Sequence, residues 1–242
     1  MTLRIAVWSG PRNISTAMMR AWENRPDCSV IDEPFYAAYL AATGLEHPMR
    51  EEILAAQSAD YVEVVEQVSQ AEVSSALQYQ KQMTHHIPRG MGMRWCADFQ
   101  HCFLIRDPAQ VIASYVQKMP SVDADAIGIQ RQAELFDEIS SVTGRAPAVI
   151  DSNDVLQNPA GVLGGLCEYL GVEFLEQDML HWPTGRRASD GVWASHWYHN
   201  VEQSTGFGEY RPVEPELEEA HRVLADAMRP YYERLAEGRI QP

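Results

Sequence analysis

Two segments about ninety residues apart each combine a cation with a hydroxyl group at the expected start of a helix. In the first, Arg12 is followed by Ser15 and Thr16; in the second, Arg106 is followed eight positions later by Ser114. Both follow a short apolar run, so we expect each to form a turn from a strand into a helix. Such a turn directs backbone N–H groups and the positive end of a helix at one place, where an oxyanion binds. Two turns of this kind suggest a ligand with two phosphate-like groups.

The first turn has the layout of a phosphate-binding loop without its usual sequence. A Walker A loop needs Gly-x-x-x-x-Gly-Lys-Ser/Thr. Counted from Gly10, the positions of the second glycine and the lysine hold Ser15 and Thr16, and the loop's cation is Arg12 instead. An ordinary strand–helix turn with a serine or threonine cap explains this segment about equally well. The second turn alone fits an Arg106 paired with a surface carboxylate and a helix capped by Asp107.

A third group of residues could move protons. His85 and His86 lie between the two turns, and a histidine whose pKa is near 6.5 suits a general base for a hydroxyl. If they continue a strand, their side chains point to opposite faces, so we expect only one to reach a substrate; His86 is slightly favoured. Glu33, at the end of an earlier strand, is a rival base. It fits equally well as a solvated carboxylate at a helix start.

Three motifs in order resemble those of the sulfotransferases. Pro11-Arg-Asn-Ile-Ser-Thr16 resembles the 5′-phosphosulfate loop of that family, and Arg106 with Ser114 resembles its 3′-phosphate motif. Between them, Lys81-Gln-Met-Thr-His-His-Ile-Pro88 is similar to the segment that carries the family's catalytic histidine. The chain looks most like the bacterial soluble sulfotransferase-like group, in which Ser-Gly-Pro-Arg-Asn-Ile-Ser-Thr and Asp-Glu-Pro-Phe recur.

The resemblance implies an enzyme that transfers a sulfuryl group from 3′-phosphoadenosine 5′-phosphosulfate (PAPS) to a hydroxyl of a small-molecule acceptor, with no metal. Arg12 and Lys81 would neutralise charge on the leaving phosphate and the sulfonyl oxygens. The catalytic residues it implies are His86 or His85, Lys81, Arg12 and Glu33. The donor would be bound by Gly10, Pro11, Arg12, Asn13, Ile14, Ser15, Thr16, Arg106 and Ser114.

The sequence also departs from the family pattern. Arg12 replaces the loop lysine, which keeps the charge and changes its reach and geometry. Ile14 replaces the loop glycine, and Ala17 replaces an aromatic residue that stacks on adenine in many relatives. The late Arg-Lys-Gly motif is absent, and Arg186-Arg187 is a poor substitute. Two other functions therefore stay open, a P-loop kinase or NTPase and a nucleotide-binding protein without turnover.

Composition limits the classes of partner. The net charge of −15 argues against binding of nucleic acid or of an anionic membrane. An anionic donor then requires a local basic pocket, for which the candidates are Arg12, Arg20, Lys81, Arg106 and Arg186. The four cysteines have no metal-ligand spacing and suit free thiols in a reducing cytoplasm. The sequence indicates no signal peptide or membrane span, and a homodimer is compatible with it.

The elements that must position these residues alternate between strands and helices. We expect one domain over residues 1–242, an α/β fold with a mainly parallel sheet flanked by helices, of the P-loop-containing nucleotide-binding, sulfotransferase-like type. Residues 87–97 are expected to form a mobile loop over a pocket or an ordinary connection. The aromatic tract 193–199 is expected to close over the ligand or to pack against the sheet. Strands are expected at 3–8, 28–31, 77–83, 101–105 and 148–151, and helices at 35–42, 49–76, 124–143, 159–170 and 214–235, the last with a break at Pro230.

Overall fold

A single five-stranded parallel sheet organises the chain in the computed structural model, which describes residues 2–119, 121–212 and 214–241. The strand order is β2-β3-β1-β4-β5, and every neighbouring pair is parallel. The predicted α/β class and all five predicted strands are confirmed, with bounds that differ by at most one residue. The strands are β1 Leu3–Ser9, β2 Cys28–Asp32, β3 Leu77–Met83, β4 Gln100–Ile105 and β5 Ala148–Asp151.

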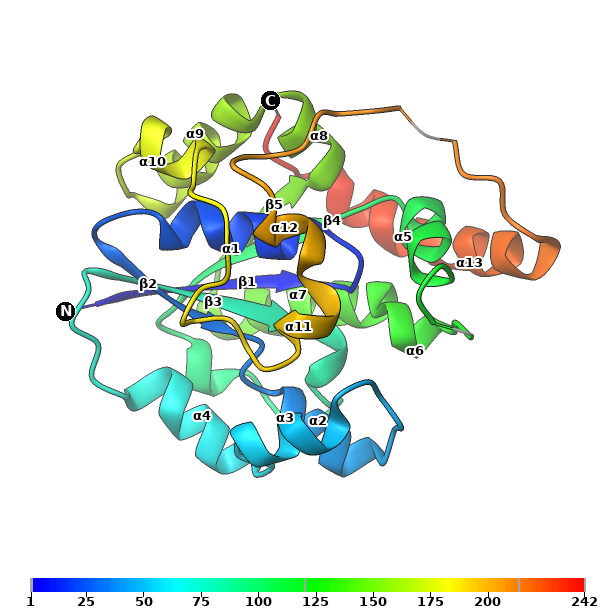
Figure 1. The fold of residues 1–242 in the computed structure, drawn as a ribbon, viewed down its shortest axis with the longest axis horizontal. Helices are drawn as coiled ribbons and strands as arrows, with labels where there is room; N and C mark the ends of the chain where they lie inside the picture. The colour runs from blue at the N-terminus through cyan, green and yellow to red at the C-terminus, as the bar shows by residue number, and fades with distance from the viewer. Residues whose placement is uncertain (1, 120, 213, 242) are drawn as a thin grey trace.

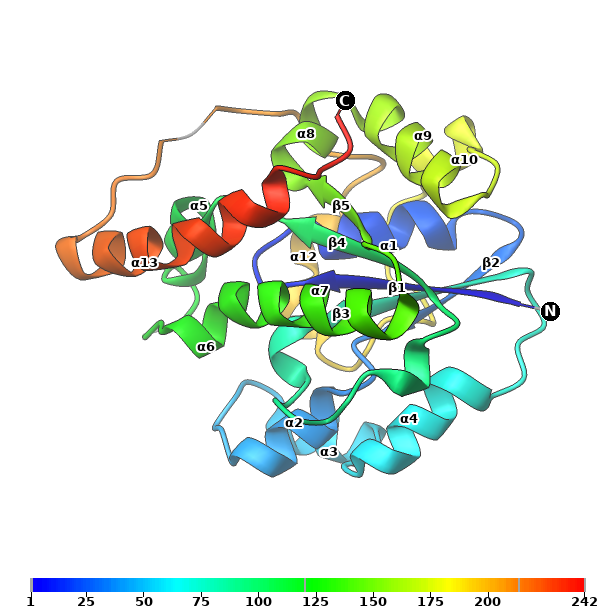
Figure 2. The same cartoon turned by 180° about the vertical axis from the view of Figure 1, so that it is seen from behind.

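Strand β1 lies at the centre of the sheet because its side chains are apolar on both faces. Ile5 and Val7 pack into one hydrophobic cluster, and Ala6 and Trp8 pack into another. This is the alternation expected of a strand buried on both sides. The first face carries α1, α9 and α10, and the opposite face carries α7 and the end of α13 (Figures 1 and 2).

The helices form the two outer layers of the molecule. They are α1 Ser15–Glu23, α2 Tyr36–Thr43, α3 Arg50–Ala56, α4 Tyr61–Gln70, α5 Pro108–Tyr115, α6 Ala124–Ile127, α7 Ile129–Thr143, α8 Ser152–Gln157, α9 Pro159–Leu170, α10 Glu176–Leu180, α11 Ala194–Trp197, α12 His199–Glu202 and α13 Glu219–Ala236, with 3-10 turns η1 Thr84–His86 and η2 Arg94–Cys96.

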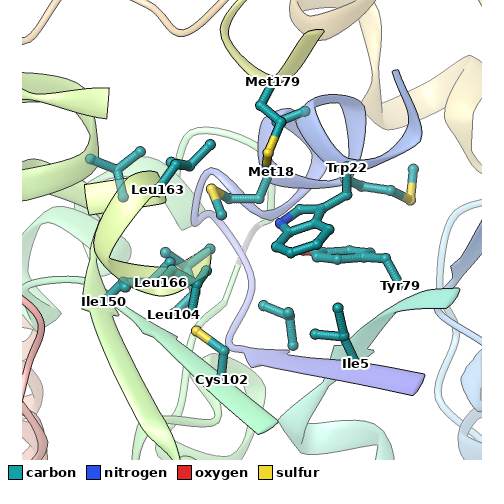
Figure 3. Packing of buried hydrophobic residues seen from close by; sticks show 14 of the residues in the cluster. Ile5, Met18, Trp22, Tyr79, Cys102, Leu104, Ile150, Leu163, Leu166 and Met179 are labelled. Carbon is teal, nitrogen blue, oxygen red and sulfur yellow. The ribbon is translucent and has the colours of Figure 1, made fainter. Parts of the chain in front are cut away.

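The core beneath α1 is aromatic and sulfur-rich (Figure 3). The ring of Trp22 stacks on Tyr79 of β3 with centroids 5.7 Å apart, and Met18 and Met179 are fully buried in the same cluster. Flexible methionine side chains fill the irregular space between the helices and the aromatic pair. This packing fixes α1, and therefore the loop before it, against the sheet.

Three predicted helices have different bounds. Residues 124–143 form two helices instead of one, because Gly128 adopts a left-handed conformation at φ 65° between α6 and α7. Residues 49–76 contain α3 and α4, and α4 starts at a new cap where the Asp60 carboxylate accepts from the N–H of Val62. Helix α13 begins at Glu219 rather than at residue 214 and continues through Pro230 without a break.

The carboxyl ends of the strands meet at one edge of the sheet. The crossover that follows β1 leads to β2 on one side of the sheet, whereas the crossover that follows its neighbour β3 leads to β4 on the other side. In open parallel sheets, ligands bind at the carboxyl edge beside such a switch point. The topology therefore brings the turns after β1, β2, β3 and β4 to one place (Figure 1). Across the described ranges, no helix is both long and apolar enough to cross a membrane.

Candidate functional site

A cavity of about 970 Å³ opens at this edge. Its wall combines the turn after β1, the ends of β2 and β3, the turn after β4, and part of the segment that follows residue 192. The structure thus brings together almost all of the site residues predicted from the sequence. Those that line the cavity are Pro11, Arg12, Asn13, Ile14, Ser15, Thr16, Glu33, Lys81, His85, His86, Arg106 and Ser114.

Gly10 is the exception among the predicted donor-binding residues. It is not part of the cavity wall, and a Cβ atom at this position would lie 2.5 Å from the carbonyl oxygen of Ile127. A glycine is therefore required here because the loop passes directly over the end of α6. The need for a glycine at this position therefore comes from a contact with another part of the protein.

The turn after β1 is shaped by Arg12. Its φ is 55°, whereas Ile14, at the position of the family's glycine, has an ordinary φ of −80°. The left-handed residue of this loop is therefore Arg12, two positions before Ile14. The Asn13 amide donates to the carbonyl of Leu104 (2.9 Å), which ties the loop to β4. No side chain caps α1, so the N–H groups of its first turn are available to an anion.

The turn after β4 differs from the prediction. The carboxylate of Asp107 accepts from the N–H groups of Ala109 and Gln110 at 2.9 and 3.3 Å. A negative group already occupies the start of α5, so the expected anion site on its backbone is wrong. What this turn offers a ligand is the side chains of Arg106 and Ser114.

These two side chains meet the first loop. Arg106 Nη1 donates to the carbonyl oxygen of Arg12 (2.6 Å), and Arg12 Nε donates to Ser114 Oγ (3.0 Å). Within the three described ranges, no carboxylate forms an ion pair with either guanidinium. Burial lowers the pKa of both arginines, and the charge of Arg12 lowers the pKa of Arg106 further. Two partly desolvated cations that face one cavity, with no ion-paired carboxylate among the described residues, are suited to binding an anion.

Lys81 has a different environment. Its Nζ donates to Asp32 (2.9 Å), to Glu33 (2.6 Å) and to the hydroxyl of Tyr198 (2.6 Å). Burial opposes the charged form, but the carboxylates of Asp32 and Glu33 raise the pKa of Lys81 well above its ordinary value. The three protons of this ammonium are therefore already bound by protein groups.

The two histidines do not alternate as strand residues. They lie in the 3-10 turn η1 with ring centroids 4.4 Å apart, so the expectation of opposite faces is wrong. His86 stacks against Tyr36 (4.6 Å) and Tyr39 (4.8 Å). Burial, together with neighbouring positive or ionisable groups, lowers the pKa of His86 well below its usual value and that of His85 to about 3. Both rings are neutral near pH 7.

Other parts of the expected basic pocket lie elsewhere. Arg20 pairs with Glu23 (3.1 Å) and Asp190 (2.7 Å) beneath α1, and Arg186 is not part of the cavity wall. Two arginines that the sequence did not suggest, Arg89 and Arg131, do line the cavity. Both pair with Glu134, at 2.9 and 3.3 Å, so their charges are partly neutralised.

Sequence reasoning also missed several aromatic and acidic residues of the site. Tyr36 and Tyr39 are three positions apart on α2, a spacing that places both on one helix face, and this was the available signal. Asp32 stood beside a candidate base but was not itself proposed. Tyr198 and Trp193, from the aromatic tract, are buried in the core cluster and also line the cavity. The expected packing is confirmed, and closure over a ligand stays a prediction.

The loop over residues 87–97 is held more firmly than expected. Met93 and Cys96 are buried in a hydrophobic cluster, so they do not form an adaptable cover. Its first residues, 87–89, line the cavity. All four cysteines have free thiols, and the described residues contain no group of three or more His, Cys, Asp or Glu arranged to hold a metal ion.

Comparisons with known proteins cover nearly the whole chain. A family model described as "Sulfotransferase domain" matches residues 3–238. Two Arabidopsis thaliana proteins called branched-chain-amino-acid aminotransferase-like protein 1 and 2 are 32% and 29% identical over 93% and 94% of the chain. The chain spans only 40% of the length of each of these relatives.

Solved structures show the same fold. A sulfotransferase domain from the curacin biosynthetic pathway superposes with a TM-score of 0.55 at 16% identity, over 95% of this chain and 98% of that one. A sulfotransferase from Alicyclobacillus acidocaldarius gives a TM-score of 0.57 at 12% identity, over 98% and 95% of the two chains. At identities this low, the superpositions show the fold alone, which is the P-loop-like architecture of the sheet and its helices.

Proposed function

The chain belongs to the sulfotransferase domain family, and from this premise we propose that it transfers a sulfuryl group from PAPS to a hydroxyl of a small molecule. The observation that carries the proposal is the pair Arg12 and Arg106. They come from two different turns, face one cavity and have no carboxylate partner in the part of the chain that the structure describes. Both guanidiniums are partly buried and repel each other, so such a pair is costly unless it binds an anion.

We assign the two ends of the donor to the two turns. The uncapped start of α1, with Ser15 and Thr16, suits the 5′-phosphosulfate group. Arg106 and Ser114 suit the 3′-phosphate. Arg12 lies between them and can neutralise charge that grows on the oxygen between phosphorus and sulfur as that bond breaks. The cavity is wide enough for a nucleotide and a small acceptor, since ligand pockets are typically about 300–1,000 Å³.

The acceptor side of the cavity contains the candidate bases. His86, His85 and Glu33 all line it, and the rings of Tyr36 and Trp197 provide apolar surface for an acceptor. In the proposed reaction, the acceptor oxygen attacks sulfur while a base takes its proton. Binding both substrates in one cavity makes this step effectively intramolecular.

The decisive experiment is calorimetric titration with 3′,5′-adenosine bisphosphate, the desulfated product, and with ATP in the presence and absence of Mg²⁺. We expect the bisphosphate to bind without metal and more tightly than ATP. If ATP binds only when Mg²⁺ is present, and the bisphosphate does not bind, the result would support the kinase or NTPase function. Tight bisphosphate binding without product from PAPS and a panel of hydroxylated small molecules would support a binding protein without turnover.

A further inference from the structure

Four polar side chains form a buried cluster at the acceptor side of the cavity. Asp32, Glu33, Lys81 and Tyr198 are 5%, 9%, 2% and 4% exposed. They come from the end of β2, from β3 and from the segment after α11, so the fold brings distant parts of the chain together here. The interpretation that follows rests on the proposed function.

The cluster holds more negative than positive charge. Lys81 is the ammonium that both carboxylates contact, at 2.9 Å for Asp32 and 2.6 Å for Glu33. One positive charge cannot neutralise two buried negative charges, and an uncompensated buried charge is costly. One of the two carboxylates is therefore poised to take up a proton.

The hydrogen bonds distinguish the two carboxylates. Asp32 accepts from Lys81, from the hydroxyl of Tyr198 (2.7 Å) and from the N–H of Gly191 (3.3 Å). Among the described residues, the side chain of Glu33 accepts only from Lys81. Asp32 therefore has more hydrogen-bond donors than the side chain of Glu33. Glu33, unlike Asp32, also lines the cavity.

Tyr198 is the group that creates this difference. Its hydroxyl accepts from Lys81 (2.6 Å) and from Trp193 Nε1 (3.1 Å), and it donates to Asp32. It thus fixes the carboxylate of Asp32 and holds Lys81 between the two carboxylates. The backbone of Glu33 is fixed as well, because its N–H donates to the carbonyl of Lys81 (3.0 Å) and its φ is 41°.

We infer that Tyr198 is a positioning residue whose hydroxyl, by holding Asp32 and Lys81, makes Glu33 the carboxylate that accepts the proton of the acceptor hydroxyl. In this step the acceptor O–H bond breaks and its proton moves to a carboxylate oxygen of Glu33. The acceptor oxygen forms a bond to sulfur, and the bond from sulfur to the 5′-phosphate oxygen breaks. The bisphosphate leaves with that electron pair.

The surroundings favour Glu33 over the histidines as the base. Burial raises the pKa of Glu33 above its ordinary value, although the charge of Lys81 opposes the rise. A carboxylate with a raised pKa is a stronger base, whereas the lowered pKa of His86 makes its ring a weaker one. The ionisable groups near Glu33 are Asp32 on β2, Lys81 on β3, Tyr36 on α2, His85 and His86 in η1, and Tyr198 after α11.

The test is an NMR titration of protein labelled with ¹³C at the glutamate side-chain carboxyls. The Glu33 signal is identified by its loss in Glu33→Gln. In the wild type we expect it to titrate at a higher pH than an ordinary glutamate. Tyr198→Phe removes the hydroxyl that contacts Asp32 and Lys81, so the Glu33 titration should broaden and its midpoint should fall by about 0.5 pH unit or more.

Two further variants keep the test decisive. Tyr232→Phe is the matched control, because its hydroxyl donates to Asp151 (2.8 Å) and neither residue lines the cavity; it should leave the Glu33 midpoint unchanged. Asp32→Asn removes the competing charge and should lower the midpoint more than Tyr198→Phe does. If Tyr198→Phe does not fold, Asp32→Asn tests whether Asp32, the carboxylate that Tyr198 contacts, controls Glu33. A Glu33 midpoint that stays unchanged or rises in the folded variants overturns the inference.

Repeating the titration with 3′,5′-adenosine bisphosphate separates this inference from the proposed function. If the bisphosphate binds, its negative charge should raise the Glu33 midpoint. Binding without such a rise would place Glu33 away from the reacting groups and overturn its assigned role. Failure of the bisphosphate to bind would contradict the proposed donor. The titrations of the unliganded variants would still decide whether Tyr198 controls Glu33.

Discussion

The cations on the two sides of the cavity have opposite surroundings. On the donor side, Arg12 and Arg106 face the cavity with no carboxylate partner in the described ranges. On the acceptor side, Lys81 is enclosed by Asp32, Glu33 and Tyr198. The resemblance to the sulfotransferases placed Lys81 and Arg12 in one role. Their partners show that a cation's availability to a ligand depends on whether the protein already neutralises it.

This difference also separates stability from binding. An enclosed ammonium stabilises the carboxylates around it, so its removal should affect folding first. An unpaired guanidinium contributes little to folding and should affect ligand binding and turnover. Substitutions on the two sides should therefore produce different kinds of loss.

The largest effect is expected from Lys81→Met. This change leaves two buried carboxylates without a counter-charge and should lower the free energy of unfolding by about 3–5 kcal/mol. Burial raises the pKa of Glu33 in the folded state. The stability that protonation of Glu33 contributes is therefore present at low pH and lost as pH rises. Without Lys81 that loss grows, so the variant should be less stable at pH 8 than at pH 5.

Urea denaturation at the two pH values measures this effect. Lys118→Met is the control, because Lys118 is exposed, and it should change stability little at either pH. An equal loss for Lys81→Met at pH 5 and pH 8 would show that its charge is not what stabilises the cluster.

On the donor side, Arg12→Gly should lower kcat by about 10²–10³-fold with a much smaller rise in the KM for PAPS. Charge on the bridging oxygen grows in the transition state, so the guanidinium is worth more there than in the ground state. Glycine is preferred to alanine because Arg12 has a φ of 55°, which glycine adopts without strain. A raised KM with unchanged kcat would make Arg12 a ground-state binding residue, and the two sides would differ less than proposed.

A smaller loss, on binding alone, is expected from Arg106→Ala. It should weaken the binding of 3′,5′-adenosine bisphosphate by about 1.5–3 kcal/mol, as expected for the loss of a hydrogen bond to a charged group. Adenosine 5′-phosphosulfate, which has no 3′-phosphate, should be weakened much less. The control is Arg229→Ala, since Arg229 pairs with Asp107 of the same turn (3.2 Å) outside the cavity wall. Equal losses for the two ligands would remove Arg106 from the 3′-phosphate site.

The sequence was sufficient for the sheet and for bringing almost all of the predicted site residues to one cavity. The strands are short apolar runs closed by turn residues, and their carboxyl ends must meet in a parallel sheet, so Arg12, Glu33 and Arg106 could be grouped in advance. Pairings between side chains far apart in the chain could not. Tyr198 contacts Lys81 across 117 positions, and no local pattern records that contact.

Local geometry was the second limit. Asp107 could be recognised as a helix cap, but that same cap removes the anion site expected on the backbone after β4. His85 and His86 extend a strand pattern, yet the chain turns at Thr84, whose hydroxyl donates to the carbonyl of Gly128 (3.1 Å). The left-handed Gly128 that makes this contact also divides the expected long helix. One long-range packing contact thus changed two local predictions.

The smallest expected effect, and the finest test of the donor side, is Ser114→Ala. In the unliganded protein, Ser114 Oγ accepts from Arg12 Nε at 3.0 Å, so the residue could act on the ligand directly or through Arg12. Loss of one hydrogen bond should weaken binding of the bisphosphate by about 0.5–1.5 kcal/mol. Ser140→Ala is the control, because the Ser140 hydroxyl bonds only within α7 and lies outside the cavity wall. Calorimetry on Ser114→Ala, Arg12→Gly and the double variant then separates the two routes. If Ser114 contacts the 3′-phosphate itself, its loss adds to that of Arg12→Gly. If the double variant binds no more weakly than Arg12→Gly alone, Ser114 acts only by holding Arg12, and the 3′-phosphate depends on Arg106.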